Sequence, residues 1–593
     1  MNDLKTQLAQ LAQQALKALY DLEADAPEWQ PTRKEFEGDL TLVVFPYLRW
    51  SRQKPEETAR QIGDWVVERL PEGAGFNVVK GFLNLSLGDG YWIKALLQQE
   101  EQGTFGPRPS QNKTLLVEYS SPNTNKPLHL GHVRNNLLGY AVAQILREAG
   151  YTTRKVQIIN DRGIHICKSM LAWQKYGAGE TPSSSGLKGD HLVGKYYVAF
   201  DKAHKENRQA LIDEGFSEEE ATEQEPLLQE ARQMLQRWEA GDEDVVALWR
   251  KMNGWVYQGF EETYRRLGVD FDQYYYESET YLLGREVVMD GLERGLFFRK
   301  EDGSVWCDLT EEKLGEKLLL RRDGTSVYMT QDIGTAIQRY EDFGLEGMIY
   351  VVGNEQDHHF KVLFAILKKL GYVWAHHLYH LSYGMVDLPS GKMKSREGTV
   401  VDADDLMDEM VATARRISEE LGKTDGMAEA EKDQLYHTVG LGALKYFILR
   451  VDPRKRMTFN PEESVDFHGD TGPFIQYTHA RIRTLLRKAE KEGLPTAKAS
   501  QYAALAPQER ELIKALLRYP EVLEEAAQDL APSALAHYVY DLTKRFNGLY
   551  QQVPILSDAD ATAVAFRLEL ARSTALAIRR GMGLLGIAVP ERM

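Results

Sequence analysis

The sequence predicts an α/β protein: a doubly wound parallel sheet, preceded by an N-terminal α+β unit and followed by an all-α helical bundle. Three observations lead to this prediction. A strand–helix–strand pattern begins near Leu115 and a second strand–helix pattern near Gly347, and strands joined by helices form parallel sheets. The periodicity from Pro461 onward is helical. The chain has 593 residues, of which 43 % are apolar and 27 % charged, so it can bury several cores.

The composition excludes some classes of protein. Cys167 and Cys307 are the only cysteines, too few for a disulfide scaffold or a cysteine-built zinc site. We therefore expect no zinc and a reducing compartment, the cytoplasm. No apolar run approaches the ~20 residues of a membrane-spanning helix, so we expect no membrane partner. The net charge of −16 argues against a nucleic-acid partner unless the basic residues are concentrated on one face.

Residues 1–110 are predicted to form the α+β unit. Apolar residues between Leu4 and Leu19 have the spacing of an amphipathic helix, interrupted by glutamines that a signal peptide would not contain. A strand, a helix and further strands are expected at 40–45, 55–70 and 76–87. Glycines and prolines from Gly103 onward indicate a linker.

Residues 111–460 are predicted to form the parallel-sheet domain, and residues 461–593 the bundle. The strands and helices of the sheet domain are expected at 115–119, 131–149, 155–159, 347–352, 359–370 and 381–386. Gly150 lies where a glycine commonly ends a helix. The segment at about 179–270 is acidic and helical and interrupts the pattern, so we predict that it is an insertion.

The segment Pro127–His132 lies between a predicted strand and a predicted helix. A helix N-terminus offers backbone N–H donors and a positive dipole end. Gly131 allows close approach of a nucleotide, and His129 and His132, three residues apart, can both donate to phosphate oxygens. Taken alone, the two histidines could equally be ordinary surface or core residues.

A second motif, Gly391–Gly398, contains Lys392, Lys394 and Arg396 and follows a predicted strand. Cations on such a loop suit the phosphates of a departing pyrophosphate. Taken alone, the loop could be a solvated basic turn. The two motifs in this order, each after a strand, favour a site for nucleotide chemistry.

These motifs resemble the HIGH and KMSKS motifs of class I aminoacyl-tRNA synthetases, and nearly the whole chain resembles the arginyl-tRNA synthetases. The resemblance is carried by residues 117–135, 328–332, 353–359, 463–473 and 583–587. It implies a Rossmann-like catalytic domain, an N-terminal domain that touches the tRNA elbow and a helical anticodon-binding domain. It also implies the activity of an arginine–tRNA ligase. L-arginine and ATP with Mg²⁺ form arginyl-adenylate, and the arginyl group passes to the 2′-hydroxyl of the terminal adenosine of the arginine tRNA.

The resemblance implies roles for individual residues. Catalysis is assigned to His129, His132 and Lys392, and ATP binding to His129, Gly131, His132, Gly353, His359, Lys392, Met393, Ser395 and Arg396. Arginine binding is assigned to Glu118, Asn123, Tyr328, Asp332 and Gln356. A guanidinium carries five donors, which suits two carboxylates and a hydroxyl. Three alternatives stay open: Glu118 could pair with a local lysine, Asp332 could cap a helix at 333–340, and Tyr328 could be a core residue.

The chain departs from the KMSKS pattern. Ser395 stands where the second lysine would be, and Lys126 precedes the HIGH motif, as in many arginyl enzymes. We hypothesise that Lys126 supplies the missing catalytic cation.

Contacts with tRNA are expected from aromatic and polar residues that can stack on, or bond to, unstacked bases. The candidates are Phe82, Asn84, Tyr477, His479, Arg481, Asn547 and Tyr550. For each one a packed strand or a buried position in the bundle is an equal alternative. Three rival functions are a cysteinyl-type synthetase, an inactive RNA-binding relative and a free-standing nucleotidyltransferase. We expect a monomer.

Overall fold

The centre of the molecule is a five-stranded parallel sheet with the order β12-β11-β5-β6-β7. Its strands are β5 (Thr114–Glu118), β6 (Thr152–Ile159), β7 (Gln273–Tyr276), β11 (Gly347–Gly353) and β12 (Leu378–Tyr383). The chain first adds strands on one side of β5 and then on the other, so the predicted doubly wound fold is confirmed. Ligands of such sheets bind at the carboxyl ends of the strands where this reversal occurs, which here lies between β5 and β11. The computed structural model describes residues 2–33, 35–70, 73–99, 103–388, 401–422, 426–494 and 499–593.

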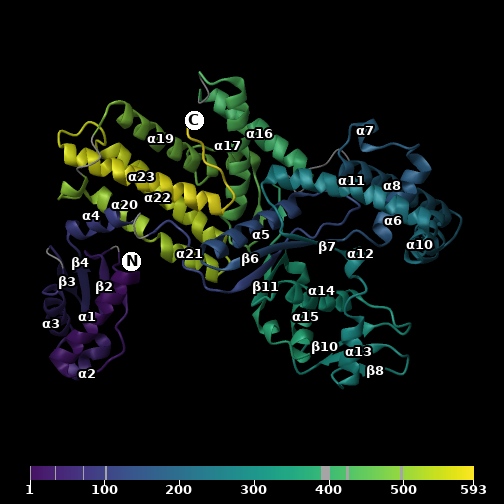
Figure 1. Ribbon diagram of the computed structural model, residues 1–593, viewed down its shortest axis with the longest axis horizontal. Helices are drawn as coiled ribbons and strands as arrows, with labels where there is room; N and C mark the ends of the chain where they lie inside the picture. Colours follow the sequence, from purple (N-terminus) through teal and green to yellow (C-terminus); the bar gives the residue numbers. More distant parts are fainter. Residues whose placement is uncertain are drawn as a thin grey trace.

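Helices cover both faces of this sheet (Figure 1). Side chains alternate along a strand, so Leu116 joins one hydrophobic core and Val117 the other. The helices α14 (Tyr328–Phe343) and α15 (Asp357–Lys369) contribute to the core that contains Leu116. The helices α5 (Leu130–Glu148) and α6 (Ile164–Tyr176) contribute to the core that contains Val117. Burial on both faces explains why the central strands β5 and β11 are mostly apolar.

Two units are inserted into the sheet domain. The predicted insertion is helical, with α7 (Pro182–Ser185), α8 (Gly189–Asp213), α9 (Glu218–Gln224), α10 (Pro226–Glu239) and α11 (Glu243–Leu267). A second unit follows β7 and was not predicted from the sequence. It contains α12 (Glu277–Thr280), α13 (Arg285–Glu293) and the antiparallel strands β8 (Phe298–Arg299), β9 (Val305–Leu309) and β10 (Gly315–Leu320). In Figure 1 the helical insertion lies at the right and the second unit below it.

The N-terminal unit is α+β, as predicted, with an antiparallel sheet of order β1-β2-β4-β3. Its elements are α1 (Asn2–Tyr20), β1 (Trp29–Pro31), β2 (Leu40–Val43), α2 (Leu48–Ser51), α3 (Pro55–Val67), β3 (Gly75–Val79), β4 (Phe82–Ser86) and α4 (Asp89–Gln98). Lys80 and Gly81 both have positive φ, 50° and 79°, and form the tight turn between β3 and β4. Lys514 Nζ of the bundle lies 2.5 Å from Asp39 Oδ1 and so links the two units.

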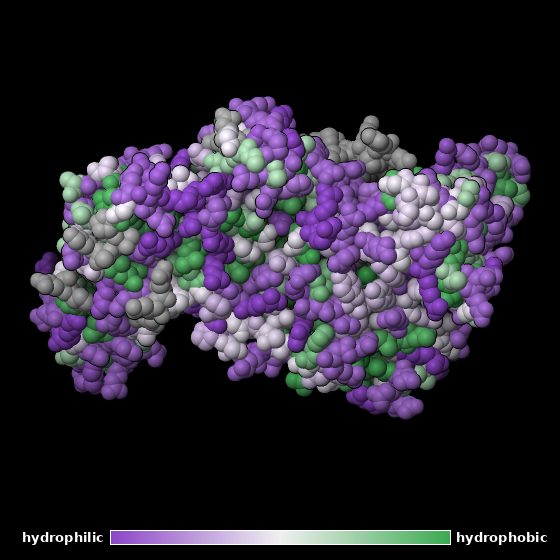
Figure 2. Space-filling model, turned by 45° about the horizontal axis from the view of Figure 1, so that its top comes forward, coloured by the Kyte–Doolittle hydropathy of each residue, from purple (hydrophilic) through white to green (hydrophobic). Residues whose placement is uncertain are grey.

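The helices α16 (Ala403–Glu420) and α17 (Glu429–Leu449) end the predicted sheet domain, and the region from residue 461 onward is all-helical, as predicted. That region comprises α18 (Pro461–Ser464), α19 (Gly472–Lys491), α20 (Pro507–Leu517), α21 (Tyr519–Gln528), α22 (Pro532–Gln552) and α23 (Ala561–Leu584). The face shown in Figure 2 is largely hydrophilic, with hydrophobic residues in small separate patches. Among the described residues, no helix is both long and apolar enough to cross a membrane.

Candidate active site

The pair His129 and His132 caps the first turn of α5. The Gly131 N–H donates to His129 Nδ1 at 3.1 Å, and the His129 N–H donates to His132 Nδ1 at 3.2 Å. Each Nδ1 therefore accepts a hydrogen bond, so a neutral ring carries its proton on Nε2. The ring centroids are 3.9 Å apart. The cap thus sets two Nε2–H donors side by side at a helix N-terminus, an arrangement suited to phosphate oxygens.

Burial keeps both imidazoles neutral. Burial first, and then the charge of Lys126, lower the pKa of His129 to about 4. The pKa of His132 is also held well below its usual value, first by burial and then by the charges of His129 and Lys126. Burial lowers the pKa of Lys126 itself. Lys126 therefore lies close enough to the histidines for its charge to act on both, which is what the hypothesis about this residue requires.

The buried Glu118 at the end of β5 pairs with Arg339 of α14. The Arg339 guanidinium lies over the ring of Tyr275, 4.9 Å from its centroid, and 5.9 Å from that of Tyr350. The partner of Glu118 is therefore a buried arginine rather than a local lysine. A substrate guanidinium that reached Glu118 would share its carboxylate with Arg339.

Asp332 and His359 lie together although the sequence assigned them to different ligands. Asp332 Oδ2 accepts from His359 Nε2 at 2.6 Å. The helix α14 begins at Tyr328 after the cap residue Val327, so Asp332 is inside the helix and the capping alternative is wrong. Tyr328 is 73 % exposed, which excludes the core alternative. Gln356 is exposed at the end of the short helix η2 (Asn354–Gln356), directly after β11.

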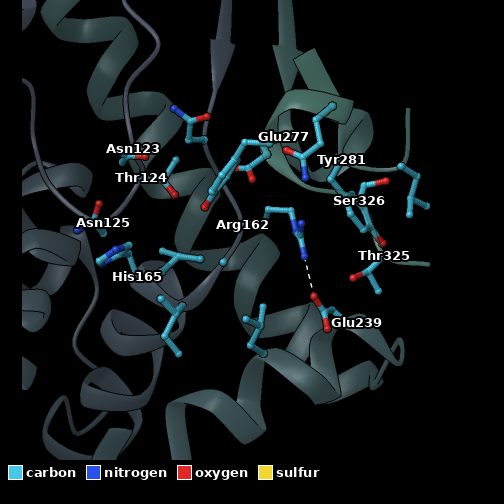
Figure 3. A pocket seen from close by; sticks show the side chains of 18 of the residues that line it. Asn123, Thr124, Asn125, Arg162, His165, Glu239, Glu277, Tyr281, Thr325 and Ser326 are labelled. Carbon is cyan, nitrogen blue, oxygen red and sulfur yellow. Dashed lines mark hydrogen bonds and ion pairs between the residues drawn. The ribbon is translucent and has the colours of Figure 1, made fainter. Parts of the chain in front are cut away.

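A cavity of about 970 Å³ has two of the predicted arginine-binding residues in its lining, whereas Glu118, Asp332 and Gln356 are not among its lining residues. Asn123, from the predicted arginine site, lies on one side of it and Ser326 on the other, with Arg162 and Glu277 between them (Figure 3). Tyr328 also lines the cavity. Its other lining residues include Asn125, Asn160, His165, Glu239, Tyr281, Arg285, Arg321 and Thr325.

Glu277 is a residue that the sequence reasoning missed. It follows β7 directly, at the carboxyl edge of the sheet, and faces the cavity. Burial raises its pKa to about 7; Arg162 opposes this rise, and Asp161 and Asp332 add to it. Arg162 itself pairs with Glu239 at 2.7 Å. An acidic residue after a parallel strand could have revealed Glu277, but the strand at 273–276 was not predicted.

Some predicted ATP-binding residues cannot be placed. Lys392, Met393, Ser395 and Arg396 lie outside the described residues. Gly353 ends β11, at the reversal point of the sheet.

A second cavity, of about 560 Å³, lies in the bundle and brings several predicted tRNA-binding residues together. Tyr477, Arg481 and Tyr550 line it. The Arg481 guanidinium lies 4.8 Å from the Tyr477 ring centroid and 5.3 Å from that of Tyr550. Arg481 Nη1 donates to Asn547 Oδ1 at 2.7 Å, and Asn547 Nδ2 donates to Thr478. Two aromatic faces beside a guanidinium can stack on bases.

Other predicted tRNA-binding residues do not reach the surface. His479 is fully buried, and its Nδ1–H donates to the Pro590 carbonyl at 3.0 Å, which fixes the C-terminal segment. Asn84 is fully buried in the N-terminal sheet and accepts from Thr41. In this arrangement neither side chain is accessible to RNA, so the buried alternative applies to both. Phe82 is half-buried and contacts the rings of Phe36 and Phe45.

Comparisons with known proteins identify the family. Residues 92–460 match the family of class I tRNA synthetases (R), catalytic domain, and residues 475–593 the DALR anticodon binding domain. Arginine–tRNA ligases of Bacteroides fragilis and Flavobacterium psychrophilum are 58 % and 57 % identical, each over 98 % of both chains. The solved Thermus thermophilus arginyl-tRNA synthetase superposes over the full length of both chains, with a TM-score of 0.78 and 27 % identity. This chain therefore belongs to the class I arginyl-tRNA synthetases.

Proposed function

We propose that this enzyme charges the arginine tRNA in two steps, with both steps at the edge of the sheet between β5, β7 and β11. In the first step an oxygen of the arginine carboxylate forms a bond to the α-phosphorus of ATP, and the bond to the bridging oxygen breaks to release pyrophosphate. In the second step the 2′-oxygen of the terminal adenosine attacks the carbonyl carbon, loses its proton and displaces AMP. The enzyme contributes positioning and charge stabilisation.

The capped pair His129–His132 is the observation that carries this proposal. Its two Nε2–H donors bind phosphate oxygens and stabilise the negative charge that grows on the α-phosphate. Lys126 beside them supplies the fixed positive charge that Ser395 does not. Mg²⁺ arrives with ATP as part of the substrate, and we propose that no zinc is required.

Arginine then lies at the cavity that Asn123 and Tyr328 line. Asn123 and Gln356 bind its α-amino and carboxylate end, and Tyr328 and Asp332 its side chain. Glu277 also lines the cavity and makes no ion pair or side-chain hydrogen bond with the other described residues. A carboxylate in such surroundings favours a fixed, fully charged guanidinium as its partner.

The tRNA is bound at two further places in this proposal. In the bundle, Tyr477, Arg481 and Tyr550 receive unstacked anticodon bases, and in the N-terminal unit the aromatic cluster around Phe82 touches the elbow. We also propose that the enzyme acts in the cytoplasm and that it is a monomer. Sedimentation of the purified chain would test the oligomeric state.

ATP–pyrophosphate exchange with each of the twenty amino acids, with and without tRNA, tests the proposal. We expect exchange with arginine alone among the amino acids and, by analogy with the family, only when tRNA is present. Exchange with a different amino acid would overturn the assignment. The His132→Ala variant should lose exchange while it keeps the thermal midpoint of the native enzyme within a few degrees.

A further inference from the structure

The inserted helix α8 packs directly against the segment that leads into the capped histidine pair. A Cβ atom on Gly194 would lie 2.9 Å from Pro127 Cδ and 3.7 Å from the Cα atom of Lys126. Contacts this close leave room only for glycine. The helical insertion α7–α11, called the inserted lobe below, therefore touches the chain immediately before His129.

The start of the same helix is also bound to the start of α16. Lys188, which precedes α8, pairs with Asp404 in the first turn of α16, and its Nζ donates to Thr263 Oγ1 of α11 at 2.5 Å. Arg266 of α11 donates from Nη1 to Asp404 Oδ1 at 2.8 Å. His191 Nε2 lies 3.3 Å from an oxygen of Asp402 and 3.5 Å from one of Asp404. The Asp404 carboxylate is 12 % exposed, so these contacts are largely shielded from water.

Backbone bonds connect this ion-pair cluster to the histidines. The Leu130 N–H donates to the Val401 carbonyl at 3.0 Å, and the Ala403 N–H donates to the Leu128 carbonyl at 2.9 Å. His129 and Asp402 are thus paired across two short antiparallel segments. A shift at Asp404 would reach His129 through a single backbone pair.

A metal ion is the competing explanation for part of this cluster. One atom from each of Asp190, His191 and Asp404 lies within 4.8 Å of the others. However, the Lys188 ammonium contacts both carboxylates, and the Arg266 guanidinium contacts Asp404 as well. Two fixed cations already neutralise these oxygens, so the cluster is an ion-pair network.

We propose that Asp404 is a positioning residue for ATP, and that the inserted lobe holds it through Lys188, His191 and Arg266. The inserted lobe fixes the histidine cap through two contacts. Gly194 packs against the chain before His129, and Asp404 holds the segment that pairs with His129. This proposal rests on the proposed role of the capped histidines in ATP binding.

The test compares Michaelis constants for the two small substrates. Asp404→Asn keeps the shape of the side chain but removes its charge, and the cap residue Asp402 is unchanged. We expect the KM for ATP to rise roughly tenfold, because small misplacements of binding groups are costly. The KM for arginine should stay within about twofold. Lys188→Met should raise the KM for ATP by a similar factor, whereas Lys188→Arg should keep it close to the native value. The double variant Asp404→Asn with Lys188→Met should raise the KM for ATP by less than the product of the two single effects.

The matched control is Lys205→Met on the same helix. Lys205 pairs with Asp201 four residues away at 2.5 Å, and both are exposed, so the KM for ATP should not change. A second comparison uses glycines. Gly194→Ala should raise the KM for ATP, whereas Gly254→Ala on α11 meets no atom within 4 Å and should not.

Two results would overturn the proposal: an equal rise in both Michaelis constants, or a lower thermal midpoint with both constants unchanged. His132→Ala separates this proposal from the one on which it rests. If His132→Ala leaves ATP turnover intact, the assigned ATP site is wrong. If it abolishes turnover while Asp404→Asn leaves the KM for ATP unchanged, only the positioning role of Asp404 is wrong.

Discussion

The nucleotide side and the amino-acid side of the proposed active site are built in different ways. The donors for ATP come from one turn of one helix, where His129 and His132 are fixed by hydrogen bonds to adjacent backbone. The residues for arginine come from strand ends and from the helix α14, and Glu118 and Asp332 are each paired with a residue from another part of the chain. Local capping therefore defines the nucleotide side, whereas tertiary packing between the sheet and its covering helices defines the amino-acid side.

Loss of one capped histidine should produce the largest effect. His132→Ala removes a fixed donor to phosphate, and removal of one such donor commonly lowers kcat by about 10²- to 10³-fold. The loss should appear in ATP–pyrophosphate exchange and be similar at every arginine concentration. The control is His376→Ala, since His376 is exposed and lies in the connection just before β12. An effect of His132→Ala on the KM for arginine alone would contradict the assignment of this histidine to the nucleotide side.

Glu277 tests the amino-acid side. Glu277→Gln should raise the KM for arginine roughly 10- to 100-fold, because a guanidinium loses a charged acceptor. Since the carboxylate has a pKa raised to about 7, it is ionised mainly above that pH. The native KM for arginine should therefore fall as the pH rises from 6 to 8, and the variant should lose this dependence.

Glu279→Gln, on the same short helix but exposed, is the matched control for Glu277. A pH dependence that survives in Glu277→Gln would assign the titration to another group.

Lys126→Met should have an intermediate effect on the nucleotide side. If Lys126 replaces the second cation of the KMSKS motif, exchange should fall roughly tenfold, within the range typical of one electrostatic contact. Lys113→Met, an exposed lysine just before β5, should have no effect. Unchanged exchange in Lys126→Met would refute the hypothesis.

Arg481→Met is expected to raise the KM for tRNA by a smaller factor, roughly three- to tenfold, because base stacking contributes about 1–3 kcal/mol. Pyrophosphate exchange at saturating tRNA should change little. Lys491→Met at the end of the same helix is the control. A large fall in thermal midpoint for Arg481→Met would instead indicate that its bond to Asn547 is structural.

The smallest expected effect concerns pH: the histidine pair should contribute no pH dependence to kcat/KM for ATP. Burial and the charge of Lys126 lower the pKa of His129 to about 4 and hold that of His132 well below its usual value, so both rings stay neutral from pH 5.5 to 8. At saturating arginine, kcat/KM for ATP should show no inflection near 6.5, the ordinary histidine value. An inflection there that disappears in His129→Ala would mean that the pair titrates in the working enzyme.

The sequence predicted the parallel sheet well because its strands are buried on both faces. Their apolar runs at 115–119, 155–159 and 347–352 overlap β5, β6 and β11. The strand expected at 381–386 is observed at 378–383, since its first residues alternate in burial and resemble a loop. The inserted unit containing β8, β9 and β10 was missed because its strands are short and partly exposed.

The candidate site was predictable where one segment contains all its parts. The capping of His129 follows from the local sequence at 127–132. The partnership of Glu118 with Arg339 joins residues 221 positions apart, so no local pattern reveals it. The same applies to Asp332 and His359, and to Glu277, whose role depends on the place of β7 in the sheet.

The buried pair of Glu118 and Arg339 has a consequence for redesign of amino-acid specificity. A substitution of Glu118 alone would leave a guanidinium without a counter-charge, and the loss of one partner of a buried pair costs roughly 3–5 kcal/mol. A library that varies Glu118 but keeps Arg339 would therefore discard most changes at Glu118 as unstable proteins. Variation of Glu118 together with Arg339, toward an uncharged pair of equal volume, opens that position to selection for a new amino acid.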